Sequence, residues 1–410
     1  MPDTSIESNG SSHNGDFAEL LRPDAPRLKS TRGPLYDTAA LGFRHYWYPA
    51  LLSRHLSGNK PQGIKLLGEN LMFMRANGRV HALFDRCAHR GMRLSYGTCL
   101  SEGTVTCPYH GWTYDVRDGQ CIAALTDGPE SPIAGQRGKS VRTYPVEERN
   151  GIVYVYMGDG NPPPLEADVP EEVLRPDWTF HAVVYTWNCN WRSAVENGFD
   201  AGHASYVHRN SLRWRTVMSL QPAWSQVTEA KIIGPYLRQG GGKPGRSQEY
   251  YPGVGPWPRY SWLRRQLAKL GNQPGHERPY PNEFRLPCMI HNKYFYCTHV
   301  RWAVPVDENI TRNFQIYAGQ YSGPHAKAFS AHYWLWHRWV WHMAFNGQDK
   351  WITERLEYEA PEQLYRPDRS IVDLRKYIET HVRTSDPGSE PIQHPGFELP
   401  SVDAAPVLSA

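Results

Sequence analysis

The sequence predicts an α+β fold with two domains: an all-β domain that is inserted in, or followed by, an α+β domain whose antiparallel sheet is flanked by helices. Three observations predict it. Short strand-like runs separated by turn residues fill the first half of the chain, and the second half mixes such runs with two segments of helical length. Between the halves, Asp159-Gly160 and the prolines at 162–164 interrupt the chain.

Six runs in the first half are rich in β-branched and aromatic residues and end at turn residues, which predicts strands. They lie at 64–67, 71–75, 80–85, 105–107, 112–116 and 152–157. The dipeptide Asn77-Gly78 separates the second run from the third. Because both residues tolerate positive φ, this dipeptide predicts a tight hairpin.

The second half and the two ends complete the domain division. We expect helices at 191–205 and 326–355, and strands at 291–305 and 313–321. Residues 1–16 are rich in Ser, Asn and Gly, which predicts disorder, and the Pro-rich C-terminal segment predicts a tail. The expected division is a lead and N-terminal segment at 1–40, a β domain at 41–160, an α+β domain at 161–384 and a tail at 385–410.

The composition excludes several classes of protein. In 410 residues, 45 Lys and Arg against 41 Asp and Glu leave a net charge of +4, which argues against a dedicated nucleic-acid binder. No apolar run approaches the about 20 residues that span a bilayer, and the N-terminus lacks the pattern of a secretory signal. We therefore expect a cytoplasmic chain without a membrane segment. Its seven Cys lack the spacing of a disulfide framework, so the 18 His beside them direct attention to metal binding.

Two short Cys/His pairs lie in the predicted β domain, Cys87-Ala88-His89 and Cys107-Pro108-Tyr109-His110. Two thiolates suit one iron of a [2Fe–2S] cluster, and two imidazoles suit the other. Because neutral nitrogens replace two anionic sulfurs, such a cluster has a raised reduction potential, about −150 to +300 mV. A structural zinc site is the alternative, but zinc sites usually group Cys with Cys and His with His. The crossed pairing favours the iron–sulfur cluster.

A second set of candidate ligands lies in the α+β domain. On the predicted helix at 191–205, Glu196, Asp200 and His203 fall at i, i+4 and i+7, which places them on one face. His208 lies about 140° further round an ideal helix, so it reaches the same metal only if the helix ends or bulges there.

Two imidazoles and one carboxylate form the facial triad of non-haem Fe(II) oxygenases, which leaves the opposite side of the iron open for dioxygen. We expect the third ligand to be Asp349, with Phe345 one helical turn earlier as an aromatic wall. A His pair at this spacing is more often unrelated to metal. The upstream cluster strengthens the prediction, because a one-electron donor needs an acceptor.

The motifs CAHRG from Cys87, CPYHGWTY from Cys107, NWRSAVENGFDAGH from Asn190 and FNGQD from Phe345 together resemble the Rieske non-haem iron oxygenases, in their terminal (α) subunit. The likeness covers residues 41–375 and is strongest to the branch that acts on carbazole-type rings. It implies an N-terminal Rieske [2Fe–2S] domain and a catalytic α+β domain. By this resemblance Cys87 and Cys107 bind one cluster iron, His89 and His110 bind the other, and the mononuclear iron is bound by His203, His208 and Asp349.

The resemblance also implies roles for three further residues. Asp200 carries the electron path, hydrogen-bonded to a cluster histidine such as His110 of a neighbouring subunit in an α3 homotrimer. The carbonyl of Gly198 accepts the substrate N–H, and Phe345 packs on the substrate rings. His203 and His208 are separated by four residues, where the carbazole branch has three, and residues 209–285 match poorly.

The implied activity is angular dihydroxylation of a polycyclic heteroaromatic such as carbazole, using O2 and electrons from a ferredoxin that a separate NAD(P)H reductase supplies. A monooxygenase of an N-heteroaromatic, such as a 2-oxoquinoline-type hydroxylase or demethylase, is the alternative on the same scaffold. A plain Rieske electron carrier is another, and it would need no second metal. Several arginines are candidates for a ferredoxin-docking face or for ordinary solvated charges: Arg86, Arg90, Arg93, Arg209, Arg213 and Arg215.

Overall fold

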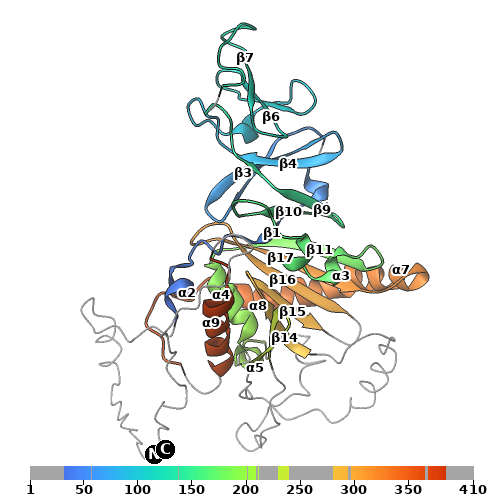
Figure 1. Cartoon of the computed structure of the whole chain (residues 1–410). Coiled ribbons are helices and arrows are strands. Elements are labelled where there is room, and N and C mark those ends of the chain that lie inside the picture. The colour runs from blue at the N-terminus through green and yellow to red at the C-terminus, as the bar shows by residue number, and fades with distance from the viewer. Residues whose placement is uncertain are drawn as a thin grey trace, which may run out of the picture.

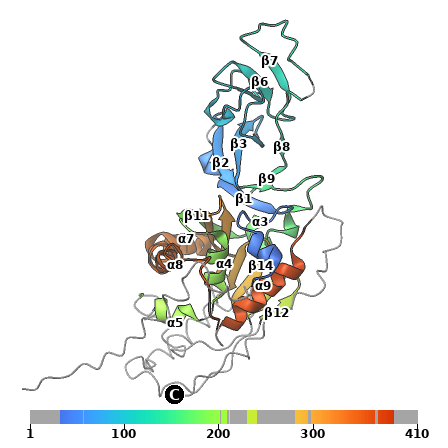
Figure 2. The ribbon, with the colours of Figure 1, turned by 90° about the vertical axis from the view of Figure 1, so that its left-hand side faces the viewer.

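The computed structural model describes residues 32–56, 58–136, 138–200, 202–208, 211, 230–239, 280–293, 297–364 and 368–384. A β region stands on a larger α+β region, and the two views at right angles show the same elongated arrangement (Figure 1, Figure 2). The predicted tail at 385–410 and residues 1–31 of the predicted lead and N-terminal segment at 1–40 lie outside the described residues.

Three antiparallel sheets build the β region. The first has the order β2-β3-β4-β8, the second β5-β6-β7 and the third β1-β10-β9. Their strands are β1 (Trp47–Leu52), β2 (Gln62–Leu66), β3 (Glu69–Ala76), β4 (Arg79–Phe84), β5 (Thr104–Thr106), β6 (Trp112–Asp115), β7 (Cys121–Ala124), β8 (Thr143–Tyr144), β9 (Val146–Arg149) and β10 (Ile152–Tyr156). All six strands predicted from the first half are confirmed to within two residues at each end. Asn77 and Gly78 both have positive φ between β3 and β4, which confirms the predicted hairpin.

One seven-stranded antiparallel sheet, in the order β11-β17-β16-β15-β14-β13-β12, forms the centre of the α+β region. Its strands are β11 (Thr179–Trp187), β12 (Ala230–Ile233), β13 (Tyr236–Gln239), β14 (Tyr280–Arg285), β15 (Met289–Lys293), β16 (Thr298–Pro305) and β17 (Thr311–Gly319). The strand predicted at 291–305 is wrong, because this segment contains two strands, β15 and β16, that pair with each other. The sequence between them, Tyr294-Phe295-Tyr296-Cys297, has no typical turn residue, so the sequence pattern predicts one continuous strand.

The helices that bear on the candidate site are α4 (Trp191–Phe199), α5 (His203–Val207), α7 (Gly323–His332), η6 (Tyr333–Phe345), α8 (Asn346–Thr353) and α9 (Arg369–His381). The consecutive helices α7, η6 and α8 confirm the helix predicted at 326–355, with a π-helical middle part, η6. The helix predicted at 191–205 is wrong beyond Phe199, because the chain becomes extended at Asp200 and a new helix begins at His203. Among the described residues, no helix is both long and apolar enough to cross a membrane.

The helix break separates Glu196 from the residues with which it was expected to share a face. Glu196 instead points into a buried network and receives hydrogen bonds from Tyr36 (3.0 Å), Tyr358 (3.1 Å) and Arg375 (2.8 Å). Tyr36 lies on α2 (Pro34–Thr38) and Arg375 on α9. Glu196 therefore attaches α4 to α2 and to α9.

Candidate metal centres

Two similar loops carry the four predicted cluster ligands. The loop after β4 contains Cys87 and His89, and the loop between β5 and β6 contains Cys107 and His110. In each loop the cysteine carbonyl accepts a hydrogen bond from the N–H of a glycine four residues later, at 3.0 Å for Gly91 and 3.1 Å for Gly111. Both glycines have positive φ, 77° and 66°, a conformation that a residue with a side chain rarely adopts.

The four side chains form an inner and an outer pair. Cys87 and Cys107 are buried, whereas His89 is exposed and its ring centroid lies 4.6 Å from that of His110. The indole of Trp112 stacks on His89 with centroids 4.9 Å apart. Burial raises the pKa of the Cys107 thiol, and the neighbouring Cys87 raises it further. Two thiols on the inside and two imidazoles toward solvent fit a cluster of two irons, each with its own pair of ligands.

A single zinc ion fits this arrangement poorly. Ligands of one zinc bind at about 2.0–2.3 Å and therefore lie within about 4 Å of one another. Among the described residues, the ligand atoms of His203, His208 and Asp349 lie within 4.8 Å of one another. The ligand atoms of the four Cys and His residues do not form such a group.

Sequence reasoning missed Tyr114, which lies on β6. Its hydroxyl lies 3.2 Å from Sγ of Cys87 and accepts a hydrogen bond from the N–H of Ala88 at 3.0 Å. When a cysteine binds an iron–sulfur cluster, a hydrogen bond of this kind to its sulfur raises the reduction potential of the cluster. The CPYHGWTY motif contains this tyrosine, but nothing in its spacing points to Cys87.

The chain conformation at Asp200 positions the first histidine of the second site. Oδ1 of Asp200 accepts a hydrogen bond from the N–H of Gly202 at 2.5 Å, and Oδ2 accepts one from the N–H of His203 at 3.2 Å. Short acidic side chains compete in this way with the helical pattern, which explains why α4 ends here and α5 begins. Helix α5 ends at Val207, so His208 leaves the helix as the expected geometry required.

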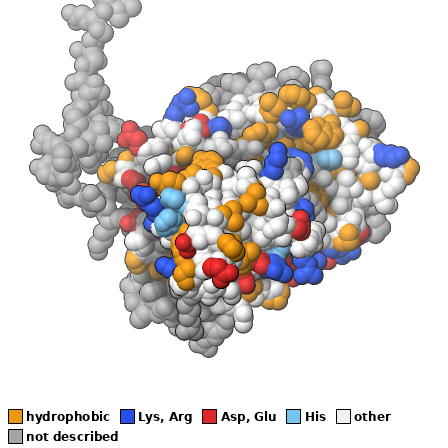
Figure 3. Space-filling model, turned by 90° about the horizontal axis from the view of Figure 1, so that it is seen from above, with side chains coloured by type: hydrophobic (Ala, Val, Ile, Leu, Met, Phe, Trp, Pro, Cys, Tyr) orange, Lys and Arg blue, Asp and Glu red, His pale blue; other side chains and the backbone are white. Residues whose placement is uncertain are grey.

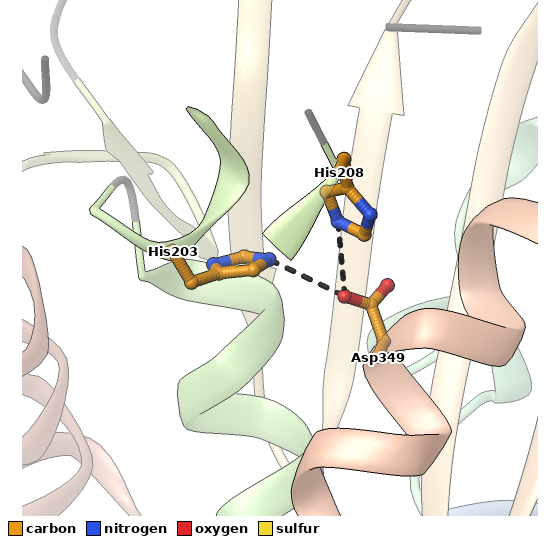
Figure 4. A group of neighbouring side chains, drawn as sticks. All are labelled: His203, His208 and Asp349. Carbon is orange, nitrogen blue, oxygen red and sulfur yellow. Dashed lines mark ion pairs between the residues drawn. The ribbon is translucent and has the colours of Figure 1, made fainter. Parts of the chain in front are cut away.

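His203, His208 and Asp349 converge on one point between α5 and α8 (Figure 4). Oδ1 of Asp349 lies 3.3 Å from Nε2 of His203 and 3.1 Å from Nε2 of His208. Asp349 and His208 are buried, and the side chain of His203 is 16% exposed. Nε2 of His208 and Oδ1 of Asp349 are buried and face each other, and among the described residues neither has a hydrogen-bond partner outside this group of three. Two imidazoles and a carboxylate with free ligand atoms fit a non-haem Fe(II) site.

Hydrogen bonds on the far side of each ring orient the two histidines. Nδ1 of His203 donates to the carbonyl of Asp200 at 2.7 Å, and Nδ1 of His208 donates to Oε1 of Gln348 at 2.9 Å. Both rings therefore direct Nε2 at Asp349. Burial lowers the pKa of His203, but the hydrogen bonds to Asp200 and Asp349 and the charges of both outweigh it and raise the pKa to about 10. The carboxylates of Asp200 and Asp349 thus favour a positive charge at this position.

The two predicted substrate residues border this site. The ring of Phe345 stacks on His208 with centroids 3.6 Å apart, and Trp341 stacks on Phe345 at 5.0 Å. Gly198 is buried on α4, two residues before Asp200.

Within one chain, the cluster and the triad are far apart. The loops that join β4, β5 and β6 lie in the upper part of Figure 1, and α5 lies near the lower end. The space-filling view from the cluster end shows histidine beside basic and apolar side chains (Figure 3). Arg86, Arg90 and Arg93 are exposed, whereas Arg209, Arg213 and Arg215 lie outside the described residues.

Comparisons with known proteins give the class. Residues 46–145 match the family of the Rieske [2Fe–2S] domain, and residues 156–249 match the homotrimeric ring hydroxylases. A solved oxygenase chain is similar over 84% of this chain and 91% of its own length, with 30% identity and a TM-score of 0.70. The chain therefore belongs to the Rieske non-haem iron ring-hydroxylating oxygenases, whose terminal subunits use one Rieske [2Fe–2S] cluster and one mononuclear non-haem iron.

That solved chain is the oxygenase of carbazole 1,9a-dioxygenase, bound to carbazole and in complex with ferredoxin. The terminal oxygenase of carbazole 1,9a-dioxygenase from Novosphingobium sp. KA1 is also similar, with 28% identity and a TM-score of 0.71 over 85% of this chain and 96% of its own. The corresponding component from Metapseudomonas resinovorans is 42% identical over 195 residues, 47% of this chain and 50% of the relative. The component from Sphingomonas sp is 44% identical over 178 residues, 43% of this chain and 46% of the relative. The chain spans about half the length of these curated relatives in the matches.

Proposed function

We propose that this chain is the terminal oxygenase of a multicomponent Rieske dioxygenase, which uses O2 and electrons from a ferredoxin to dihydroxylate a polycyclic heteroaromatic such as carbazole at an angular position. One observation carries the proposal: His203, His208 and Asp349 converge on a cation site whose wall is the ring of Phe345. An open metal site beside an aromatic surface suits the oxidation of a flat ring. Similarity to the carbazole oxygenases supports the choice of substrate.

In this proposal Cys87, His89, Cys107 and His110 hold the cluster, and His203, His208 and Asp349 hold the mononuclear iron. When bound, the cluster supplies electrons one at a time and the iron supplies activation of O2. The residues of the chain hold these groups in place and orient the substrate. The hydrogen bonds to Asp200 and Gln348 fix each histidine with its proton on Nδ1, so that Nε2 is available as a ligand.

Phe345 and Gly198 orient the substrate. A polycyclic ring gains apolar contact area from Phe345, whose ring also stacks with Trp341. The carbonyl of Gly198 is proposed to accept the ring N–H, which would fix one edge of a carbazole-like substrate. These two contacts together would determine which ring carbons face the iron.

Electron delivery in this proposal crosses between subunits. The cluster loops and α5 lie at opposite ends of one chain, so the donor for each triad would be the cluster of a neighbouring copy (Figure 1). A head-to-tail homotrimer closes such a ring, and the matched ring-hydroxylase family is homotrimeric. Asp200 lies beside His203, and its carboxylate is proposed to receive a hydrogen bond from His110 of the neighbouring subunit.

A ferredoxin is the proposed electron donor. The cluster end offers exposed basic and apolar side chains, among them Arg90, Tyr109 and Leu125, which suit transient docking of a small acidic protein. The solved carbazole oxygenases in complex with ferredoxin support this choice. A separate NAD(P)H reductase would reduce the ferredoxin. We place this electron chain in the cytoplasm, where thiols stay reduced.

The test is turnover in isotopically labelled O2 by the purified chain with a reconstituted ferredoxin and reductase. Carbazole, a dioxin-type ether and a quinolinone serve as candidate substrates. Incorporation of two labelled oxygens into one product molecule is expected. A single labelled oxygen would instead establish the monooxygenase alternative, and no product from any of the three would contradict the proposed substrate class.

A further inference from the structure

A buried guanidinium lies behind the carboxylate ligand of the second site. Arg301 on β16 is 7% exposed, and its Nη1 lies 3.7 Å from Oδ2 of Asp349. The other oxygen of this carboxylate, Oδ1, faces His203 and His208. The two oxygens of Asp349 therefore have different neighbours, a cation site on one side and a fixed positive charge on the other.

The fold holds Arg301 in this position through the sheet. Arg301 pairs with Gln315 across β16 and β17, so both side chains project from the same face. Oε1 of Gln315 accepts a hydrogen bond from Nδ2 of Asn346 at 2.7 Å. Asn346 precedes Asp349 by three residues on α8, so the two lie on one helix face. Two neighbouring residues of the sheet thus hold two neighbouring residues of the metal-binding helix.

Gly198 leaves the space that Arg301 occupies. A Cβ atom at this position of α4 would clash with Nη2 of Arg301. The end of the guanidinium therefore fits between α4 and α8 only because residue 198 has no side chain. This packing gives Gly198 a role beyond its carbonyl, because any larger residue would have to displace Arg301 from Asp349.

We propose that Arg301 is a positioning residue of the mononuclear iron site, one that directs Asp349 to bind the metal through Oδ1 alone. This inference rests on the proposed function only in its assignment of the triad as a metal site. A carboxylate with two equivalent oxygens can bind a metal through both of them. A guanidinium beside Oδ2 balances the charge on that oxygen and makes it the poorer ligand. One-oxygen binding leaves a further coordination position open for O2.

The test measures metal binding, not turnover. The protein with its cluster intact is freed of mononuclear metal and titrated with Co(II), whose visible absorption weakens as its coordination number rises. In Arg301→Met we expect affinity for Co(II) to rise about tenfold or more, because a positive charge beside the site is lost and Oδ2 becomes available as a second ligand, and the absorption of the bound ion to weaken. Arg301→Lys keeps the charge without the planar geometry, and we expect an intermediate affinity and spectrum.

Two further variants keep the test decisive. Arg285 is another buried arginine, but it donates to the carbonyls of Glu166 and Ala167, so Arg285→Met should keep the parent affinity and spectrum. Gly198→Ala should displace Arg301 and reproduce the weakened absorption, which carries the test if Arg301→Met does not fold. If both Arg301→Met and Gly198→Ala keep the parent spectrum and affinity, the positioning role is overturned. If Arg301→Met does not fold, the parent spectrum and affinity in Gly198→Ala alone overturn it. Either result leaves the proposed function intact. Failure of the parent protein to bind Co(II) through Asp349 would overturn the triad itself.

Discussion

Oε1 of Gln348 accepts a hydrogen bond from Nδ1 of His208 at 2.9 Å, and Gln348 directly precedes Asp349 on α8. One turn of helix therefore supplies the proposed carboxylate ligand and also orients a proposed histidine ligand from a distant segment. Asn346 attaches the same turn to β17, and Phe345 covers the His208 ring. The site is assembled mainly by α8, against which the segment after α4 is held.

Replacing Gln348 with Leu removes the acceptor for His208. We expect metal affinity to fall about 10- to 100-fold, because the ring loses the hydrogen bond that fixes its tautomer and orientation. Equilibrium titration of the metal-free protein with Fe(II) under anaerobic conditions measures the change. Gln348→Glu retains an acceptor at this position and is the matched control, with an expected affinity close to that of the parent. Equal loss in both variants would contradict this role.

Replacing Phe345 with Ala removes the aromatic wall beside His208. The lost aromatic contact should cost about 1–1.5 kcal/mol, which corresponds to a roughly tenfold increase in the Kd of carbazole. Substrate titration of the resting protein measures Kd without turnover. Phe345→Leu keeps an apolar side chain, and its Kd should lie between those of the parent and Phe345→Ala. An unchanged Kd in Phe345→Ala would show that the substrate binds elsewhere.

Asp200→Asn separates the structural role of Asp200 from its proposed electron-transfer role. The amide oxygen of Asn can still accept one of the two backbone hydrogen bonds that the carboxylate accepts, and the Asp200 carbonyl that holds His203 is unchanged, so we expect the parent fold and iron content. Transfer from cluster to iron should slow about 10- to 100-fold, because the charged link to the neighbouring cluster histidine is lost. Stopped-flow reoxidation of the prereduced cluster by O2, in the presence of substrate, measures the rate. A parent rate in this variant would remove Asp200 from the path.

Glu196→Ala tests the anchoring of α4. The substitution leaves the buried Arg375 without one of its carboxylate partners, and removal of one member of a buried ion pair costs about 3–5 kcal/mol of unfolding free energy. Urea denaturation followed by circular dichroism measures the loss. Tyr358→Phe removes a single hydrogen bond to the same carboxylate and should cost only about 1 kcal/mol. Similar small losses in both variants would show that Glu196 is not the centre of this network.

Much of the first domain could be predicted from local patterns. Its strands are short and bounded by turn residues, and Asn77-Gly78 has the backbone preference that the hairpin requires. The four proposed cluster ligands can be recognised in the sequence because Cys and His stand close together within two loops. Tyr114 was missed, since its contact with Cys87 depends on how β6 packs against the loop after β4.

The second site depends more on tertiary structure. His203 and Asp349 are far apart in the sequence, and their pairing came from a known chemical triad together with a family resemblance. The break in the helix at Asp200 was not predicted, because its cause is capping by a side chain that is also acceptable within a helical pattern. Arg301 carried no signal either, since a charged residue in a strand usually points to solvent. Its burial follows from the space that Gly198 leaves on another element.

The most direct test of the two-centre arrangement is iron analysis of an Asp349→Ala protein, combined with electron paramagnetic resonance of its reduced cluster and product analysis. We predict that this protein keeps the red-brown colour and rhombic signal of the Rieske cluster, lacks the mononuclear iron and forms no product. Full oxygenation by Asp349→Ala, or full retention of its mononuclear iron, would contradict the assignment of His203, His208 and Asp349 as the catalytic iron site.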